Sequence, residues 1–557
     1  MKTTELLRHG TLGKATVLFT MLFSLQSVRA DISINASNFP DTNFRNYLTS
    51  KFGSSLSDNE IATCYAMNVS GKSISSLTGI QYFDMLAALN CSNNNLTQLD
   101  VSKNRTLQTL NCSNNKLTQL LVEGSLMTDL NCSHNNLTNL ELDNCYQYLE
   151  KLDCSYNKFT EIEFTYLYEL KELNCEQNTQ LKKLNCSHNA LQTLNVDGCS
   201  ALTTLNCSYN QLNPMLTVYG LNNLTSLDCR NNQYLYTLSC PNNALEELYF
   251  SYCPNLTGIV CKGNKLNTLS FSGYYNLQKL DCSNNPLLEV LDCSDNGIKE
   301  LIVSGCPKLS SLFCASNSFE TLSLENMNLD YVDCSDNKSL KTLSCVNNKL
   351  TYITVRGCTA LTDLYLWNNQ LPYLNVSDCS NLVSLCCQDN QLTSLLTSGC
   401  TKLEYLQCYH NKLTSLNIQD NSNLLHLSCY GNSIDSYQMG NLVNKLPNRN
   451  GKTEGKLYVI EFEYAYEHNV CNTNHVAIAR QRNWSTYRIS GSYYADYPGS
   501  FPTDVQTIDG ISDDRSDAPR YNLNGQRVGN SYKGIVIQGG RKLSARLCRS
   551  ALQRTEN

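Results

Sequence analysis

The fold is decided by residues 107–120, which read LQTLNCSNNKLTQL. Residues 149–159, LEKLDCSYNKF, place leucine, cysteine and asparagine in the same order, so both follow L-x-x-L-x-C-x-x-N-x-L. So many copies of one short unit predict a repeat protein rather than several globular domains. The repeat runs over residues 86–434, and its asparagines are Asn94, Asn115, Asn135, Asn157, Asn178, Asn189, Asn210, Asn232, Asn243, Asn264, Asn285, Asn296, Asn317, Asn337, Asn348, Asn369, Asn390, Asn411 and Asn432.

Each unit predicts a short strand with one buried side. In residues 110–112, Leu110 and Cys112 point to one side of an extended chain, while Asn111 points to the other. The coils of such a chain stack at the spacing of hydrogen-bonded strands, about 4.8 Å. The asparagine turns the chain, and its amide can satisfy backbone groups that a tight bend leaves unpaired. We therefore expect a stacked asparagine ladder and a β-rich solenoid with caps at both ends.

Every coil also has a second half of similar form, such as residues 191–199, LQTLNVDGC. Most spacings between ladder asparagines are 20–22 residues, but those from 178 to 189, 232 to 243, 285 to 296 and 337 to 348 are 11. Each extra half either moves the asparagine half to the opposite side of the coil or loops out. The change of side is favoured because the inserted halves keep their inward residues.

This pattern resembles the leucine-rich repeat family, with cysteine in one leucine place. The nested period of 21 residues is similar to the bacterial subclass sometimes called IRREKO, and the resemblance covers about 350 residues. It implies a leucine-rich repeat solenoid, but it names no ligand.

Most of the 29 cysteines occupy two repeat positions. Eighteen fill the inward place after the leucine, and seven take the turning place of the second half. Stacked neighbours have parallel side chains, which suit a disulfide dihedral of about 90° poorly. We therefore expect buried free thiols that act as small apolar groups. Outside both sets stand Cys64, Cys386, Cys471 and Cys548.

The remaining segments divide the chain further. Residues 1–30 have the basic start, short apolar run and small residues of a signal peptide. Residues 31–85 are expected to form an N-terminal cap, with a helix in 38–48 and a capping box at Ser57 and Glu60. Residues 435–500 predict a C-terminal cap with helices at 437–446 and 474–482 and strands at 456–462 and 484–489. Residues 501–518 predict a linker.

The last segment, residues 519–557, contains YNLNGQRV at 521–528 and KGIVIQGGRK at 533–542. It is similar to the C-terminal segment of secreted proteins of anaerobic Gram-negative bacteria, where related longer tails are sorting signals for type IX secretion. The resemblance implies a secreted or surface-displayed protein, associated with the outer membrane. A basic arm for nucleic acid is the competing interpretation, but the segment shows no nucleic-acid-binding module.

The sequence favours binding over catalysis. It contains none of the common nucleophile, zinc or phosphate-binding motifs, so we expect no enzyme activity, cofactor or metal. The net charge of −6 and the absence of long apolar runs indicate neither a nucleic-acid partner nor a transmembrane span. We expect a monomeric protein that binds an extracellular protein or glycan. A structural surface-layer role, or a targeting arm of an enzyme, are the alternatives.

The expected binding face lies in the block from residue 348 to 432, where aromatic side chains fill outward positions. Aromatic residues with a polar edge bury much area at low entropic cost, and they dominate interface hot spots. A general abundance of tyrosine is the competing explanation. The face consists of Tyr365, Trp367, Tyr405, Tyr409, His426 and Tyr430.

Overall fold

A computed structural model describes residues 30–122, 125–142 and 147–500, and four short strands between residues 520 and 543. The chain divides into two compact units, residues 1–500 and 501–557. Most of the signal peptide predicted at 1–30, and the linker at 501–518, lie outside the described residues. None of the described helices is long and apolar enough to span a membrane.

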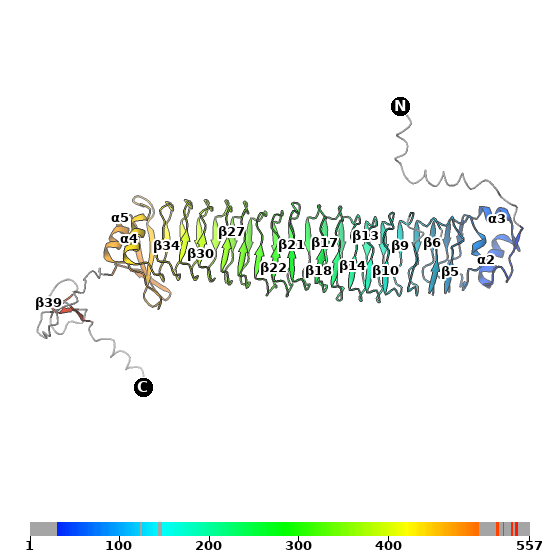
Figure 1. Cartoon of the computed structure of the whole chain (residues 1–557), viewed down its shortest axis with the longest axis horizontal. Helices are drawn as coiled ribbons and strands as arrows, with labels where there is room; N and C mark the ends of the chain where they lie inside the picture. The colour runs from blue at the N-terminus through cyan, green and yellow to red at the C-terminus, as the bar shows by residue number, and fades with distance from the viewer. Residues whose placement is uncertain are drawn as a thin grey trace, which may run out of the picture. The chain divides into compact units, whose positions relative to one another are not determined.

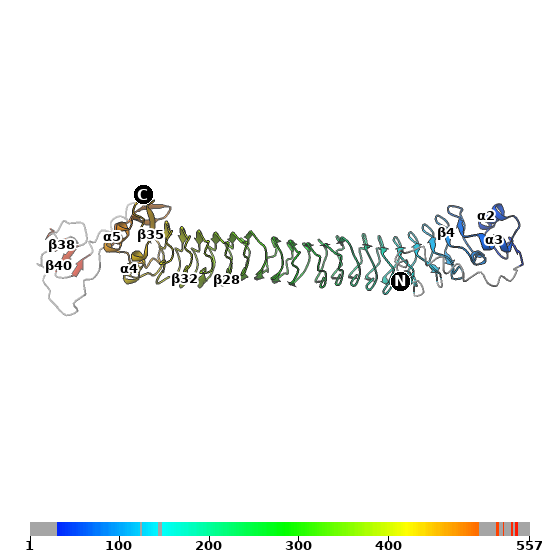
Figure 2. The same ribbon diagram turned by 90° about the horizontal axis from the view of Figure 1, so that it is seen from above.

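The first unit is a β-solenoid of about 17 coils of the leucine-rich repeat type, with coils of about 21 residues. The three-residue strands lie on two faces, and most successive strands alternate between them. Each face is built from parallel sheets (Figures 1 and 2).

Face 1 contains β3 (Ala66–Asn68), β4 (Ala88–Asn90), β6 (Thr109–Asn111), β8 (Asp129–Asn131), β9 (Lys151–Asp153), β11 (Glu172–Asn174), β13 (Thr193–Asn195), β15 (Met215–Thr217), β17 (Thr237–Ser239), β19 (Gly258–Val260), β21 (Lys279–Asp281), β23 (Glu300–Ile302), β25 (Thr321–Ser323), β27 (Thr342–Ser344), β29 (Asp363–Tyr365), β31 (Ser384–Cys386), β33 (Tyr405–Gln407) and β34 (His426–Ser428). Face 2 contains β5 (Gln98–Asp100), β7 (Gln119–Leu121), β10 (Glu161–Glu163), β12 (Lys183–Asn185), β14 (Thr204–Asn206), β16 (Ser226–Asp228), β18 (Glu247–Tyr249), β20 (Thr268–Ser270), β22 (Val290–Asp292), β24 (Ser311–Phe313), β26 (Tyr331–Asp333), β28 (Tyr352–Thr354), β30 (Tyr373–Asn375) and β32 (Ser394–Leu396).

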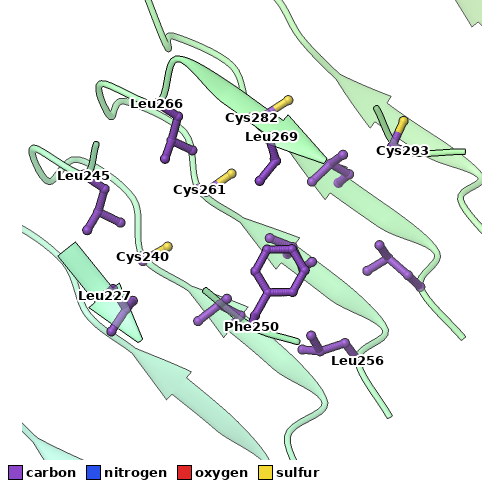
Figure 3. Packing of buried hydrophobic residues seen from close by; sticks show 14 of the residues in the cluster. Leu227, Cys240, Leu245, Phe250, Leu256, Cys261, Leu266, Leu269, Cys282 and Cys293 are labelled. Carbon is purple, nitrogen blue, oxygen red and sulfur yellow. The ribbon is translucent and has the colours of Figure 1, made fainter. Parts of the chain in front are cut away.

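The core lies between the two faces and consists of rows of leucine and cysteine. Leu110 and Cys112 are buried, whereas Asn111 between them is partly exposed, as the alternation predicts. Figure 3 shows Cys240, Cys261 and Cys282 on successive coils. The 27 cysteines of the described residues are free, and all of them except Cys386 are buried. Burial raises the pKa of the Cys91 thiol to about 12, so the reactive thiolate is strongly disfavoured.

A thiol-labelling experiment checks this arrangement. We expect native protein to react at very few cysteines and at Cys386 first, because it alone among the described cysteines is partly exposed. Denatured protein should expose nearly all thiols to the same reagent. Rapid labelling of many cysteines in the native protein, or disulfides found by mass spectrometry, would contradict it.

The asparagine ladder binds each coil to the one before it. The Nδ2 group of Asn369 donates to the carbonyl of Leu366 at 3.0 Å and to that of Cys345, 24 residues earlier, at 2.9 Å. Its Oδ1 atom accepts the backbone N–H of Leu350 at 3.0 Å. Second-half cysteines also reach back 24 residues, since the thiol of Cys358 donates to the carbonyl of Cys334 at 3.1 Å. In the second half of a coil, the cysteine thiol therefore makes the hydrogen bond to the preceding coil that the asparagine amide makes in the first half.

The predicted change of side at the 11-residue spacings is confirmed by strand pairing. Before Asn178 the asparagine halves lie on face 1, where β4, β6, β8, β9 and β11 form one sheet. After the first insertion the asparagine half β12 pairs with β10, a second half on face 2. The next insertion returns the asparagine halves to face 1, where β17 pairs with β15. Further exchanges follow at β22 and β27.

Opposite each asparagine block the sheet is interrupted. Among the described strands, no pairing joins β13 to β15, β18 to β20, β23 to β25 or β28 to β30, and each gap lies on the face without the ladder. Backbone pairing between coils is therefore more continuous on the asparagine face. The coils form a nearly straight stack in Figures 1 and 2.

The N-terminal end is covered by α2 (Thr42–Phe52) and α3 (Asp58–Thr63), with the small strands β1 (Ile32–Ser33) and β2 (Ser55–Leu56) and the 3-10 helix η1 (Ile80–Tyr82). The capping box predicted at Ser57 and Glu60 is present. The helix predicted at 38–48 begins at Thr42, because Asp41 is its N-cap and Pro40 stays outside it. Strand β3 already pairs with β4 in parallel, so the first coil strand lies before residue 86.

The C-terminal end contains α4 (Ser436–Lys445), β35 (Gly455–Glu461), α5 (Thr473–Gln481), β36 (Trp484–Ser490) and β37 (Tyr493–Asp496). The two helices and two strands predicted there are confirmed, with bounds shifted by at most one residue. The sequence did not predict that β35 and β36 extend the face 1 sheet in parallel beyond β34, or that β37 closes it as an antiparallel edge.

In the second unit, β38 (Arg520–Asn522), β39 (Arg527–Val528), β40 (Val536–Gln538) and β41 (Arg541–Leu543) form an antiparallel sheet in the order β39-β38-β40-β41. These strands coincide with the two motifs of the predicted sorting segment, with Arg520 and Leu543 one residue outside them. The rest of that segment lies outside the described residues.

Candidate binding face

All six residues of the expected binding face lie on face 1, on β29, β33 and β34 or directly after them. Tyr365 ends β29, Tyr405 begins β33 and His426 begins β34. Trp367, Tyr409 and Tyr430 each follow the inward residue of their coil. Tyr405 is 41% exposed and the other five are partly buried.

The structure brings these six side chains together as three pairs. The rings of Tyr365 and Trp367 meet edge to face at 5.8 Å, and those of Tyr405 and His426 lie 6.2 Å apart. Tyr409 and Tyr430 stack at 4.5 Å with their planes 9° apart. The coil that carries Cys386 separates the first pair from the other two, because β31 lies between β29 and β33.

The C-terminal cap adds aromatic residues that the sequence did not assign to this face. His426 stacks on Tyr458 of β35 at 4.8 Å, and Tyr458 stacks on Tyr487 of β36 at 4.9 Å. Tyr494 of β37 meets both tyrosines edge to face and is 63% exposed. We call Tyr405, His426, Tyr458, Tyr487 and Tyr494 the cap aromatic row. The sequence does contain a signal for this placement, because Tyr458 follows Leu457 as Tyr365 follows Leu364. It did not predict that β35, which carries Tyr458, pairs in parallel with β34.

The ring geometry limits what this face can bind. Tyr458 has a stacked neighbour on each face, and Tyr409 and Tyr430 cover one face of each other, so ring edges and hydroxyl groups make up much of the surface that remains for a partner. Burial raises the pKa of Tyr409 and Tyr430, which keeps both as neutral hydroxyl groups that can donate and accept. The face therefore offers apolar edges with a polar rim, as protein interfaces do.

A histidine between two carboxylates joins the last coils to the cap. His410 sits at the left-handed position before its ladder asparagine, with φ at 50°. Its Nδ1 atom lies 2.8 Å from Asp389 Oδ1, and its Nε2 atom lies 2.6 Å from Glu461 Oε2 of β35. Burial lowers the pKa of His410, but hydrogen bonds and charges of the two carboxylates outweigh it and raise the pKa overall. Its ring also stacks on Tyr464 of the cap at 4.1 Å.

This contact predicts a pH dependence of cap attachment. Because the pKa of His410 is raised above its ordinary 6.5, its stabilising contribution is complete below pH 6.5 and is lost as pH rises through the raised value. We expect the backbone amides of the C-terminal cap to be less protected from hydrogen–deuterium exchange at higher pH, once the pH dependence of the intrinsic exchange rate is corrected for. His410→Gln should abolish this dependence, whereas His134→Gln, at the same repeat position, should retain it. An unchanged profile in His410→Gln would refute the assignment.

No group of three or more histidine, cysteine, aspartate or glutamate side chains suited to a metal is found in the described part of the chain. The inward cysteines form rows along the coils rather than converging on one point, which is not the arrangement of a zinc site. Within residues 30–500, apart from the undescribed gaps, we identify none that would hold a cofactor.

Fold and face together define a leucine-rich repeat solenoid with an aromatic surface at its C-terminal end. No protein-family model matches the chain, and no curated protein sequence does either. Among solved structures, the chain is similar to the functional domain of InlJ from Listeria monocytogenes, which includes a cysteine ladder. The two are 27% identical, with 79% of this chain and 83% of that chain covered and a TM-score of 0.30.

Two further structures are similar to the chain. YopM from Yersinia enterocolitica is 22% identical, covering 76% of this chain and 91% of that chain with a TM-score of 0.25. A leucine-rich repeat protein of Leptospira interrogans is 20% identical, covering 72% and 97% with a TM-score of 0.25. Scores this low carry no argument about function, and the fold assignment rests on the strand pairing of the chain itself.

Proposed function

We propose that this is a secreted or surface-displayed binding protein whose partner docks on the aromatic part of face 1. The observation that carries the proposal is the gathering of Tyr365, Trp367, Tyr405, Tyr409, His426 and Tyr430 on one sheet. The cap aromatic row then extends this surface over β35, β36 and β37. Rigid strands hold these rings, so little side-chain entropy is lost when a partner binds.

A protein is favoured over a glycan as the partner of this face. Sugars are bound through the flat face of an exposed ring, but both faces of Tyr458 and one face each of Tyr409 and Tyr430 are covered by stacked neighbours. Ring edges and hydroxyl groups instead suit the mixed apolar and polar core of a protein interface. Lys456, paired in register with His426, adds positive charge near this surface.

The experiment that tests this function is a binding screen with purified protein. A defined panel of extracellular proteins and glycans would be immobilised, and saturable binding measured by surface plasmon resonance. We expect at least one protein of the panel to bind saturably. Glycan binding that the double variant Tyr365→Ala/Trp367→Ala abolishes would contradict the choice of a protein partner. Failure of every member of the panel to bind would count against a binding role.

Export is the second part of the proposal, supported by the signal-like start and the sorting-like tail of the sequence. If residues 519–557 act as a sorting segment, protein recovered from the cell surface should lack them. Mass spectrometry of surface-released protein should therefore find no peptide beyond residue 518, while the cell-internal form retains them. Intact Asn557 on surface-located protein would contradict this prediction.

A further inference from the structure

A second surface of the solenoid, near its N-terminal end, has the form of a ligand site. A shallow hollow of about 550 Å³ lies over β6, β8, β9, β11 and β13 on face 1. Four of these strands, β6, β8, β9 and β11, belong to the first asparagine block, and β13 is the first second-half strand after the change of side. Its outward lining side chains are Thr109, Asn111, Asp129, Asn131, Lys151, Asp153, Glu172, Asn174, Thr193 and Asn195.

The hollow contains a row of hydrogen-bond donors that are held in place. Asn111 and Asn131 are paired in register on neighbouring strands, and Asn90 extends the row by one strand. In each, Oδ1 accepts the backbone N–H two residues further on, at 3.0–3.1 Å. This bond fixes the amide, and within the described residues no partner binds the Nδ2 groups of these three asparagines. Successive donors therefore repeat at the strand spacing, about 4.8 Å.

Acceptors lie beside this row. Asp153 follows Asn131 in the same column, and its Oδ1 atom accepts from Asn174 Nδ2 at 3.1 Å. Asp129 receives a hydrogen bond from Thr128 at 2.8 Å through one oxygen, Oδ2, and leaves the other to a ligand. Lys151 and Glu172 form an ion pair at 2.9 Å and neutralise each other. The remaining lining charge is negative, which disfavours an acidic ligand.

The lining contains no aromatic or arginine side chain that could anchor a protein. It offers fixed amide donors, threonine hydroxyl groups and carboxylate acceptors, which match the hydroxyl groups of a sugar, since each hydroxyl can donate and accept. A stacked pair, His134 and Tyr156 at 4.1 Å, lies just beyond the ends of β8 and β9. We propose that this hollow binds a neutral oligosaccharide lying across the strands, at a site separate from the aromatic face.

The test uses the whole protein and four neutral probes: cellohexaose, xylohexaose, maltohexaose and chitohexaose. Binding is measured by isothermal titration calorimetry for wild type and for the double variant Asn111→Ser/Asn131→Ser. Serine occupies the same repeat slot at Ser239 and Ser344, so the fold should tolerate it. We expect at least one probe to bind wild type, and the double variant to weaken that binding at least fivefold.

Two controls keep this result separate from the proposed function. Asn206→Ser changes the same repeat slot on face 2 and should leave probe binding unchanged. Tyr365→Ala/Trp367→Ala should also leave probe binding unchanged, because these two residues lie in the aromatic part of face 1, which is a different site. The proposal is overturned if no probe binds wild type at millimolar concentration, if Asn111→Ser/Asn131→Ser binds normally, or if only the aromatic variant loses the probe.

Discussion

Asn210→Ala should lower the free energy of unfolding by about 1–3 kcal/mol, because the buried N–H of Leu191 loses its partner, and the carbonyls of Cys186 and Cys207 each keep only one ladder amide, that of Asn189 or Asn232. Asn210 is 5% exposed. Its Nδ2 group donates to the carbonyls of Cys186 at 2.9 Å and Cys207 at 3.0 Å, and its Oδ1 atom accepts the N–H of Leu191 at 2.9 Å. Removing the amide therefore loosens two coils at once.

Urea unfolding followed by circular dichroism measures this loss. Asn210→Asp should be nearly as unstable, because a buried carboxylate oxygen would face the carbonyl oxygens of Cys186 and Cys207, to which it cannot donate. Asn206→Ser, four residues earlier on an outward position, should change stability by no more than about 0.5 kcal/mol. Equal stability of Asn210→Ala and Asn206→Ser would show that the ladder does not hold the coils together.

Tyr365→Ala/Trp367→Ala should weaken binding of the protein partner at least tenfold, which is about 1.4 kcal/mol. The two rings contact each other edge to face, and both are partly buried outside the leucine and cysteine core. Their loss removes aromatic contact area from the proposed interface, while the melting curve should hardly change. Surface plasmon resonance with the partner found in the screen gives the dissociation constants.

A matched control exists on face 2. Tyr166, His188 and Tyr209 stack at 4.9 and 4.2 Å, and both tyrosines are about half exposed. Tyr166→Ala/Tyr209→Ala therefore removes comparable aromatic area away from the aromatic face and should leave the dissociation constant unchanged. If both double variants weaken binding equally, aromatic content rather than the position on face 1 determines recognition.

Much of the solenoid could be predicted because its repeat is local. A leucine and a cysteine two residues apart define the inward side of a coil wherever they occur. The ladder asparagine follows three residues after the cysteine, at Asn94 and Asn432 as at Asn210. Even the exchange of faces follows from counting, since 11 residues are half a coil. Local signals also identified the capping box at Ser57, where side chain and backbone lie three residues apart.

The parts that could not be predicted depend on contacts distant in sequence. Asn469 joins the ladder from within the cap, donating to the carbonyls of Cys429 at 2.8 Å and Val459 at 3.0 Å, but no repeat surrounds it. Tyr458 and Tyr487 reach the aromatic face only because β35 and β36 pair in parallel with the last coil. Glu461 meets His410 for the same reason, across 51 residues. Pairing across such an interval leaves no periodic signal in the sequence.

The most direct test of the central claim is hydrogen–deuterium exchange of the protein with and without its saturating partner. The account predicts added protection at residues 363–367, 405–409 and 426–430 and on β35 and β36, with no change on face 2 between β10 and β18. Protection confined to face 2, or to the caps without β29 and β33, would contradict the claim that the aromatic part of face 1 is the binding surface.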